Sequence, residues 1–151
     1  MSLLVASPRS PVGALVSRPA VRVPAEATLA EAAAAMRSAS VSSLLVGSAG
    51  GIVTERDLVE AMARRLGPDE PVTVVASEDP LVVPYETSVV DAAAAMLNHE
   101  VRHLIVAMPD ASPAVISLRD LMGVLIQAVN PGIWLASLRV SLSSSPESWW
   151  G

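Results

Sequence analysis

Two short motifs in the chain place a carboxylate three residues after a hydroxyl side chain. Thr54 precedes Asp57 and Ser117 precedes Asp120, and in both motifs an apolar stretch runs directly into the hydroxyl residue. A helix that begins there would present unpaired N–H groups and the positive end of its dipole, which suits a phosphate. An ionised Asp in the first helical turn can also accept hydrogen bonds from two adjacent hydroxyls, such as those of a ribose. Both motifs are therefore candidates for contact with a sugar phosphate.

The same residue types at the same spacing also form an ordinary capping box. Such a box satisfies the free amides at a helix start and is worth about 1 kcal/mol. Thr28 and Glu31 have this spacing too, and we interpret that pair as a cap only. A purely structural role therefore stays open for the other two motifs, and the repetition of the surrounding sequence favours at least one working site.

The chain contains two copies of one unit, which is the signature of a repeat architecture. Residues 26–46 align with residues 86–106 at a constant offset of 60, and nine of the 21 aligned positions are identical. The hydroxyl–acid motifs are offset by 63, because the loop 108–113 is longer than its counterpart. Insertions collect in exposed loops, so this is where extra length is expected. The sequence predicts a flexible segment 1–10, a first copy 11–70, a second copy 71–130, and a tail 131–151 without predicted structure.

Each copy is expected to run strand, helix, strand, strand, helix. One copy alone would bury little surface, so we expect the two copies to pack their sheets together in an α/β (α+β) fold. The helix 55–66 is expected to place Leu58, Met62 and Leu66 on one face. The predicted strands are 21–23, 43–47, 52–53, 81–83, 103–107 and 114–116, and residues 71–76 are an apolar connector whose pattern is also compatible with a strand. The predicted helices are 28–39, 55–66, 88–98 and 118–129, with a short one at 11–17.

Composition excludes several classes of function. The 151 residues include no Cys, so disulfides and thiol chemistry are ruled out, and a net charge of −5 disfavours nucleic acid as the main partner. Uninterrupted apolar runs are shorter than the about 20 residues that span a bilayer, and the N-terminus has no secretory pattern. We therefore expect a cytoplasmic protein. No nucleophile–base pair, carboxylate dyad or metal cluster supports catalysis, so we expect no enzyme and no metal site.

The order of elements, the prolines that end the first strands, the Ala-rich helices and the closing motifs together resemble the cystathionine beta-synthase (CBS) domain family. The resemblance covers roughly residues 11–129 and is closest to a standalone tandem pair, often called a Bateman module. In that family, paired copies bind adenosine-containing ligands such as AMP, ADP, ATP, NAD or S-adenosylmethionine in clefts between them. The resemblance implies a regulatory sensor without a catalytic cofactor, a homodimer, and a separate enzyme or transporter as the regulated partner.

The resemblance also assigns residues to two clefts. The family Asp holds the ribose hydroxyls and the Thr or Ser contacts ribose or phosphate, which implies one cleft at Asp57 and another at Asp120. Basic residues often lie near the phosphates on the second strand, and Arg102 and His103 fit that pattern whereas their counterparts do not. The clefts are therefore expected to be unequal. The implied residues are Thr54, Asp57, Leu81, Val101, Arg102 and His103 for one cleft, and Ser117, Asp120, Val21, Val41, Ser42 and Ser43 for the other.

A second reading has no ligand at all. The sheets and Ala-rich helices would then serve dimerisation or assembly alone, and the hydroxyl–acid pairs would be caps. In the tail, Trp134 could cover the end of the core, and Trp149 with Trp150 could dock on a second subunit or a partner.

Overall fold

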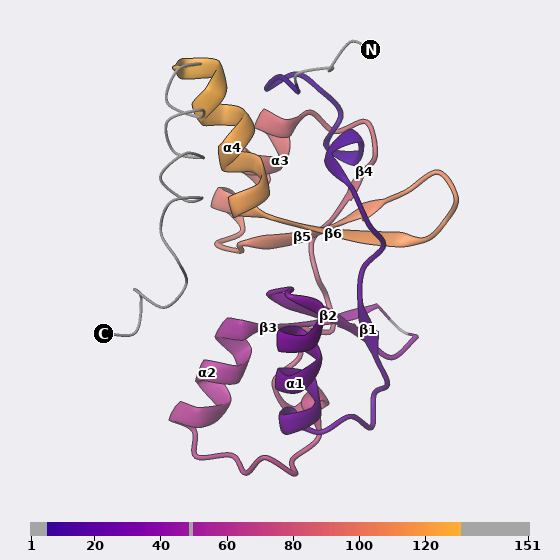
Figure 1. Cartoon of the computed structure of the whole chain (residues 1–151), viewed down its shortest axis with the longest axis vertical. Coiled ribbons are helices and arrows are strands. Elements are labelled where there is room, and N and C mark those ends of the chain that lie inside the picture. The colour runs from indigo at the N-terminus through magenta and orange to yellow at the C-terminus, as the bar shows by residue number, and fades with distance from the viewer. Residues whose placement is uncertain (1–5, 49, 131–151) are drawn as a thin grey trace.

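The computed structural model of the chain describes residues 6–48 and 50–130. Two three-stranded sheets face each other across the middle of the molecule, and each sheet carries two helices on its outer side (Figure 1). This is the mixed α+β architecture with two repeated halves that the sequence predicts. None of the helices in the described ranges has the length and apolar character needed to cross a membrane.

The first half contains β1 (Arg22–Val23), α1 (Leu29–Ala39), β2 (Ser43–Val46), β3 (Gly51–Thr54) and α2 (Glu55–Ala63). The second half contains β4 (Val82–Pro84), α3 (Val89–Asn98), β5 (His103–Ala107), β6 (Pro113–Ser117) and α4 (Leu118–Val129). The sheet order is β1-β2-β3 in one half and β4-β5-β6 in the other. In each half the first pair of strands is parallel and the second pair is antiparallel. The sheets are thus built identically, and the candidate motifs lie at equivalent ends of β3 and β6.

Alternation along the strands separates two kinds of buried side chain. Leu44 and Val46 belong to the cluster beneath α1, whereas Leu45 between them is buried without belonging to it. Because successive side chains point to opposite faces of a sheet, Leu45 faces the other sheet. Ile52 and Ile105 follow the same rule. The same alternation places Thr54, Ser117 and His103 on the inner faces, toward the gap between the sheets.

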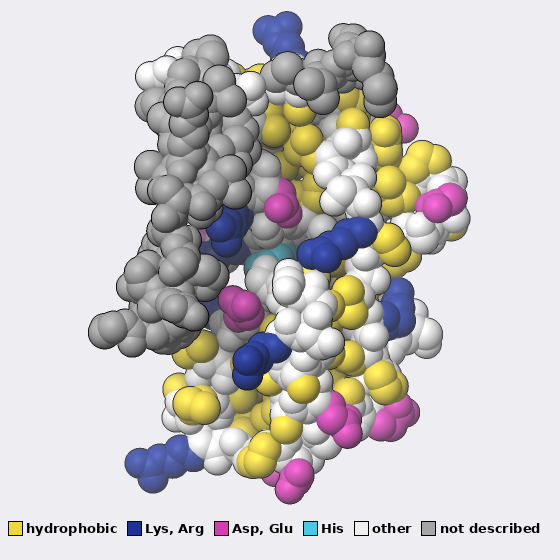
Figure 2. Space-filling model, in the orientation of Figure 1, with side chains coloured by type: hydrophobic (Ala, Val, Ile, Leu, Met, Phe, Trp, Pro, Cys, Tyr) yellow, Lys and Arg dark blue, Asp and Glu magenta, His cyan; other side chains and the backbone are white. Residues whose placement is uncertain are grey.

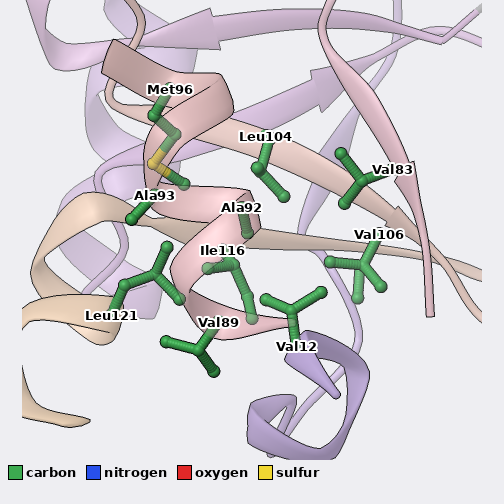
Figure 3. Packing of buried hydrophobic residues seen from close by; sticks show 11 residues of the cluster. Val12, Val83, Val89, Ala92, Ala93, Met96, Leu104, Val106, Ile116 and Leu121 are labelled. Carbon is green, nitrogen blue, oxygen red and sulfur yellow. The ribbon is translucent and has the colours of Figure 1, made fainter. Parts of the chain in front are cut away.

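Each half is completed by the segment that precedes the other. The 3-10 helix η1 (Val12–Leu15) inserts fully buried Val12 among the core residues of the second half (Figure 3). The 3-10 helix η2 (Val72–Val74) inserts fully buried Val72 into the core of the first half. Val12 donates its N–H to the Thr87 carbonyl at 2.7 Å, and Val72 donates to the Ala27 carbonyl at 2.8 Å. Each half therefore contains a residue from outside its own predicted range. The predicted boundary between residues 70 and 71 stays a prediction.

Three local expectations from the sequence are wrong. Residues 72–74 of the connector form the 3-10 helix η2 instead of a strand, because fully buried Val72 packs into the core of the first half. Helix α2 ends at Ala63, three residues early, because Arg65 adopts a left-handed φ of 58°. Met62 does not share a buried face with Leu58, as 80% of it is exposed. Ala61 is the buried residue of α2.

The N-terminal residues 6–10 contact the second half of the chain. Within the segment 1–10, residues 6–10 are described, and the carbonyls of Pro8 and Ser10 accept hydrogen bonds from Val90 and Val89. The flexibility expected for this segment stays a prediction. The roles expected for Trp134, Trp149 and Trp150 fall outside the described residues.

Candidate functional site

The two hydroxyl–acid motifs begin the two helices that follow the inner ends of the sheets. Thr54 is the N-cap of α2, and Ser117 is the N-cap of α4. Both have extended backbone, so the strand passes into the helix without a loop between them. The first helical amides donate to the residues just before the second strands, with Glu55 N–H bonded to the Ser42 carbonyl and Leu118 N–H to the Arg102 carbonyl. Strand pairing therefore fixes where each helix starts.

Each carboxylate closes a capping box with one of its two oxygens. Asp57 Oδ2 accepts from Thr54 N–H at 2.7 Å and from Thr54 Oγ at 2.9 Å. Asp120 Oδ2 accepts from Ser117 N–H and from Ser117 Oγ, both at 2.9 Å. Within residues 6–48 and 50–130, the second oxygen, Oδ1, has no hydrogen bond in either residue. One acceptor per motif thus remains for another molecule, and a ribose diol would need it or would displace the cap.

Exposure distinguishes the two motifs. Asp57 is half-buried, whereas Asp120 is exposed. Thr54 and Ser117 are both half-buried. The two sites are therefore unequal in solvent access as well as in their neighbouring residues.

A side-chain hydrogen bond joins the halves between the two motifs. Ser42 Oγ lies 2.8 Å from Nε2 of His103, in a partly buried setting. The family resemblance implies different clefts for these two residues, yet the structure brings them into direct contact. The two sets of residues therefore share one boundary. Figure 2 shows acidic, basic and histidine side chains close together at the level where the halves meet.

Several charged groups surround the imidazole of His103. Burial lowers the pKa of His103 below its ordinary value of 6.5, and this effect outweighs the carboxylates of Asp120, Glu55 and Asp57, which raise it. The guanidinium of Arg102 lowers the pKa further. The imidazole is consequently neutral at pH 7 in the unliganded protein. Glu55 was not predicted as part of this site, although its position directly after Thr54 is a usable signal.

The remaining predicted residues flank this contact. Ser43 is buried and pairs with Thr54 across β2 and β3, while Arg102 is exposed beside His103. The four apolar candidates are half-buried: Val21 and Val41 pack on the core of the first half, and Leu81 and Val101 on that of the second. They can present part of their surface to a base while remaining anchored in a core.

Two shallow cavities lie at equivalent places elsewhere on the sheets. One, of about 420 Å³, is lined by Val82, Val83, Pro84, Tyr85, Glu86, Ala107 and Pro109. The other, of about 510 Å³, is lined by Arg22, Val23, Pro24, Gly47 and Ser48. None of the predicted site residues lines either cavity. The repeated prolines, Pro24 and Pro84, were a sequence signal for the equivalence of these places but not for the cavities.

The described residues include no group of three or more His, Cys, Asp or Glu side chains placed to hold a metal ion. The arrangement offers instead helix-start amides, two hydroxyls, two free carboxylate oxygens and one imidazole. These are groups that bind a polar ligand through hydrogen bonds.

Comparisons with known proteins find relatives for both halves of the chain. The family model described as CBS domain matches twice, at residues 12–64 and 72–127. An uncharacterized 17.7 kDa protein from Acidianus ambivalens is 38% identical over 104 residues, covering 66% of this chain and 63% of the relative. This chain therefore spans less than two thirds of that relative's length.

Solved structures share the fold. A CBS domain protein from Pyrobaculum aerophilum, complexed with AMP, is 29% identical with a TM-score of 0.67, covering 79% of this chain and 98% of that one. A CBS-domain-containing protein from Agrobacterium tumefaciens has a TM-score of 0.69 at 24% identity, with coverages of 75% and 97%. A hexameric CBS-CP12 protein from bloom-forming cyanobacteria has a TM-score of 0.68 at 24% identity, with coverages of 74% and 69%. With two matched copies in tandem and this architecture, the chain belongs to the CBS domain family.

Proposed function

We propose that this chain binds an adenosine-containing nucleotide between its two halves, at the end of the sheets where α2 and α4 begin. The observation that carries the proposal is the pair of equivalent helix starts, each with a hydroxyl in its capping box and one carboxylate oxygen left free for a ligand. AMP is the best supported ligand, because a family member 29% identical to this chain is complexed with it. ADP, ATP, NAD and S-adenosylmethionine are the other candidates.

Each group has a defined task in this proposal. The amides of the first turn and the hydroxyl of Thr54 or Ser117 contact the phosphate, where the helix dipole favours negative charge. The Oδ1 atoms of Asp57 and Asp120 accept from the ribose hydroxyls. The half-buried apolar residues that precede the first and second strands of each half cover the base. No covalent step is needed, so the proposed role is regulatory and not catalytic.

Binding would act on the packing of the two halves, because the ligand lies between them. A separate enzyme or transporter would read that change, and a cytoplasmic homodimer is the form that we propose for the protein. Exposed apolar side chains on α2 and α4, among them Met62 and Met122, offer surface for a second copy.

Calorimetric titration of the full chain with AMP, ATP, NAD and S-adenosylmethionine tests the proposal. Asp57→Ala and Asp120→Ala should each remove binding at one cleft. Glu31→Ala is the matched control, because Glu31 closes a capping box of the same kind with Thr28 at 3.0 and 3.1 Å, on the start of α1. A folded protein that binds none of the four ligands would contradict the proposal.

The assembly reading has one specific observation in its favour. Both carboxylates are already bonded to their own caps, as a purely structural role requires. Under that reading, Asp57→Ala and Asp120→Ala would cost only about 1 kcal/mol of stability each, like Glu31→Ala. Nucleotide would then leave the thermal midpoint of the protein unchanged.

A further inference from the structure

The contact between Ser42 and His103 stands at the meeting point of both candidate clefts. Ser42 precedes β2 in the first half, and His103 opens β5 in the second. The hydrogen bond therefore links the two halves through side chains that carry no permanent charge. A ligand that bonds to Nε2 of His103 must displace Ser42 from it.

The charges around His103 are unfavourable for an anion. The negative charges of Asp57 and Glu55 act on it from α2 and that of Asp120 from α4, while the positive charge of Arg102 acts from the residue just before β5. Three negative groups face one positive group. A phosphate entering here adds more negative charge to a partly desolvated place, and a second positive group would offset it.

We propose that His103 takes up a proton when a nucleotide phosphate binds, and that its imidazolium then bonds to the phosphate in place of Ser42. This rests on the proposed function. The proton comes from solvent and occupies the free ring nitrogen, and one N–H of the ring donates to a phosphate oxygen. Ser42 Oγ is released, so ligand binding also opens a contact between the halves. The Ser42–His103 hydrogen bond is thus a latch that an anionic ligand opens.

The protonation behaviour of the unliganded protein supports this scheme. Burial keeps the pKa of His103 below 6.5, so the ring enters the encounter without a proton at neutral pH. A phosphate within hydrogen-bonding distance favours the charged ring and raises that pKa. Affinity for the nucleotide should consequently fall as pH rises through neutrality. A chain without this coupling would show no such fall.

Calorimetry of the full chain with AMP, at pH 7 in buffers of different ionisation enthalpy, measures the proton directly. We expect net uptake of a fraction of one proton per AMP, and its loss in His103→Gln. His99→Gln is the control, because His99 is exposed at the end of α3 and bonds to the Ala95 carbonyl at 2.9 Å. AMP binding with no uptake, or with uptake unchanged in His103→Gln, would overturn the proposal. Absence of binding by every nucleotide would instead refute the proposed function and this inference with it.

Two further measurements keep the test independent of how well His103→Gln folds. Ser42→Ala removes the latch but keeps the imidazole, so it should bind AMP more tightly and retain proton uptake. Weaker binding by Ser42→Ala would show that the hydroxyl serves the ligand directly and would refute the latch. NMR of the His103 ring in the unaltered chain should show its pKa rising when AMP is added, whereas adenosine, which lacks phosphate, should leave it in place. An equal rise with adenosine would refute the role of the phosphate.

Discussion

Gly13 lies directly against the ring of Tyr85, and a methyl group on its Cα would overlap ring atoms Cγ, Cδ2 and Cε2. The Gly13 N–H also donates to the Tyr85 carbonyl at 3.0 Å. Backbone and ring together therefore hold η1 on the second half. This position tolerates no side chain because the space is filled, not because of its φ angle.

Gly13→Ala should destabilise the protein by about 1–3 kcal/mol, since the added methyl group must push the Tyr85 ring or η1 aside. Urea unfolding followed by circular dichroism measures the change. Gly67→Ala is the matched control, because no atom lies within 4 Å of the Cβ it would add. Equal midpoints for both variants would show that η1 is not held in this way.

Val12→Ala and Val72→Ala should each cost about 2 kcal/mol, because both side chains are fully buried. The two variants should also differ in which half of the protein is destabilised. Val12→Ala should speed amide exchange mainly in the core of the second half, around Val106, and Val72→Ala mainly in that of the first, around Leu44. Hydrogen exchange by mass spectrometry distinguishes the two patterns. Faster exchange in the first half for Val12→Ala, or in the second half for Val72→Ala, would contradict the packing of η1 and η2 described above.

Thr28→Ala and Thr54→Ala should lose similar stability, about 1 kcal/mol each, because both hydroxyls accept from the third amide of a helix. Their effects on AMP should differ. Thr54→Ala should weaken AMP binding at least tenfold, while Thr28→Ala should leave it unchanged. Thermal unfolding and calorimetry of both variants make the comparison, and equal affinities would refute the contact between Thr54 and the nucleotide.

Stability should decline as pH falls below 6.5, in part because of His103. Its pKa is lower in the folded protein than in the unfolded chain, so the unfolded chain takes up the proton first. Between 6.5 and the folded pKa the unfolded state binds more protons, and stability therefore rises with pH in that window and is fully present above it. His103→Gln should show a smaller loss between pH 7.5 and pH 5.5 than the unaltered chain. An identical loss in urea titrations at both pH values would refute this assignment.

The repeat made most of the fold predictable from the sequence. Because residues 26–46 and 86–106 align, each pattern that predicts a strand, a helix or a cap occurs twice. The strands, helices and caps follow in the same order in the structure. The N-caps Thr54 and Ser117 were predictable for a local reason, since a cap depends on residues three positions apart.

Relations between distant residues could not be predicted in this way. The apolar residues 71–76 have a pattern that is compatible with a strand. Val72 instead packs into the core of the first half from a 3-10 helix, and this depends on contacts with residues distant in sequence. Met62 has helical spacing relative to Leu58, yet α1 and the sheet leave it outside. The bond between Ser42 and His103 depends on how the two sheets face each other, which no single copy encodes.

The insertion of Val12 and Val72 into each other's half bears on how such a protein could arise. A single-copy ancestor with this architecture would have had to form a domain-swapped dimer, in which the first 3-10 helix of each molecule packs into the core of the other. Gene duplication would then have turned a reciprocal swap between two molecules into an arrangement within one chain. After fusion, the two halves no longer need to be identical, and differences such as serine at position 42 and arginine at position 102 become permissible.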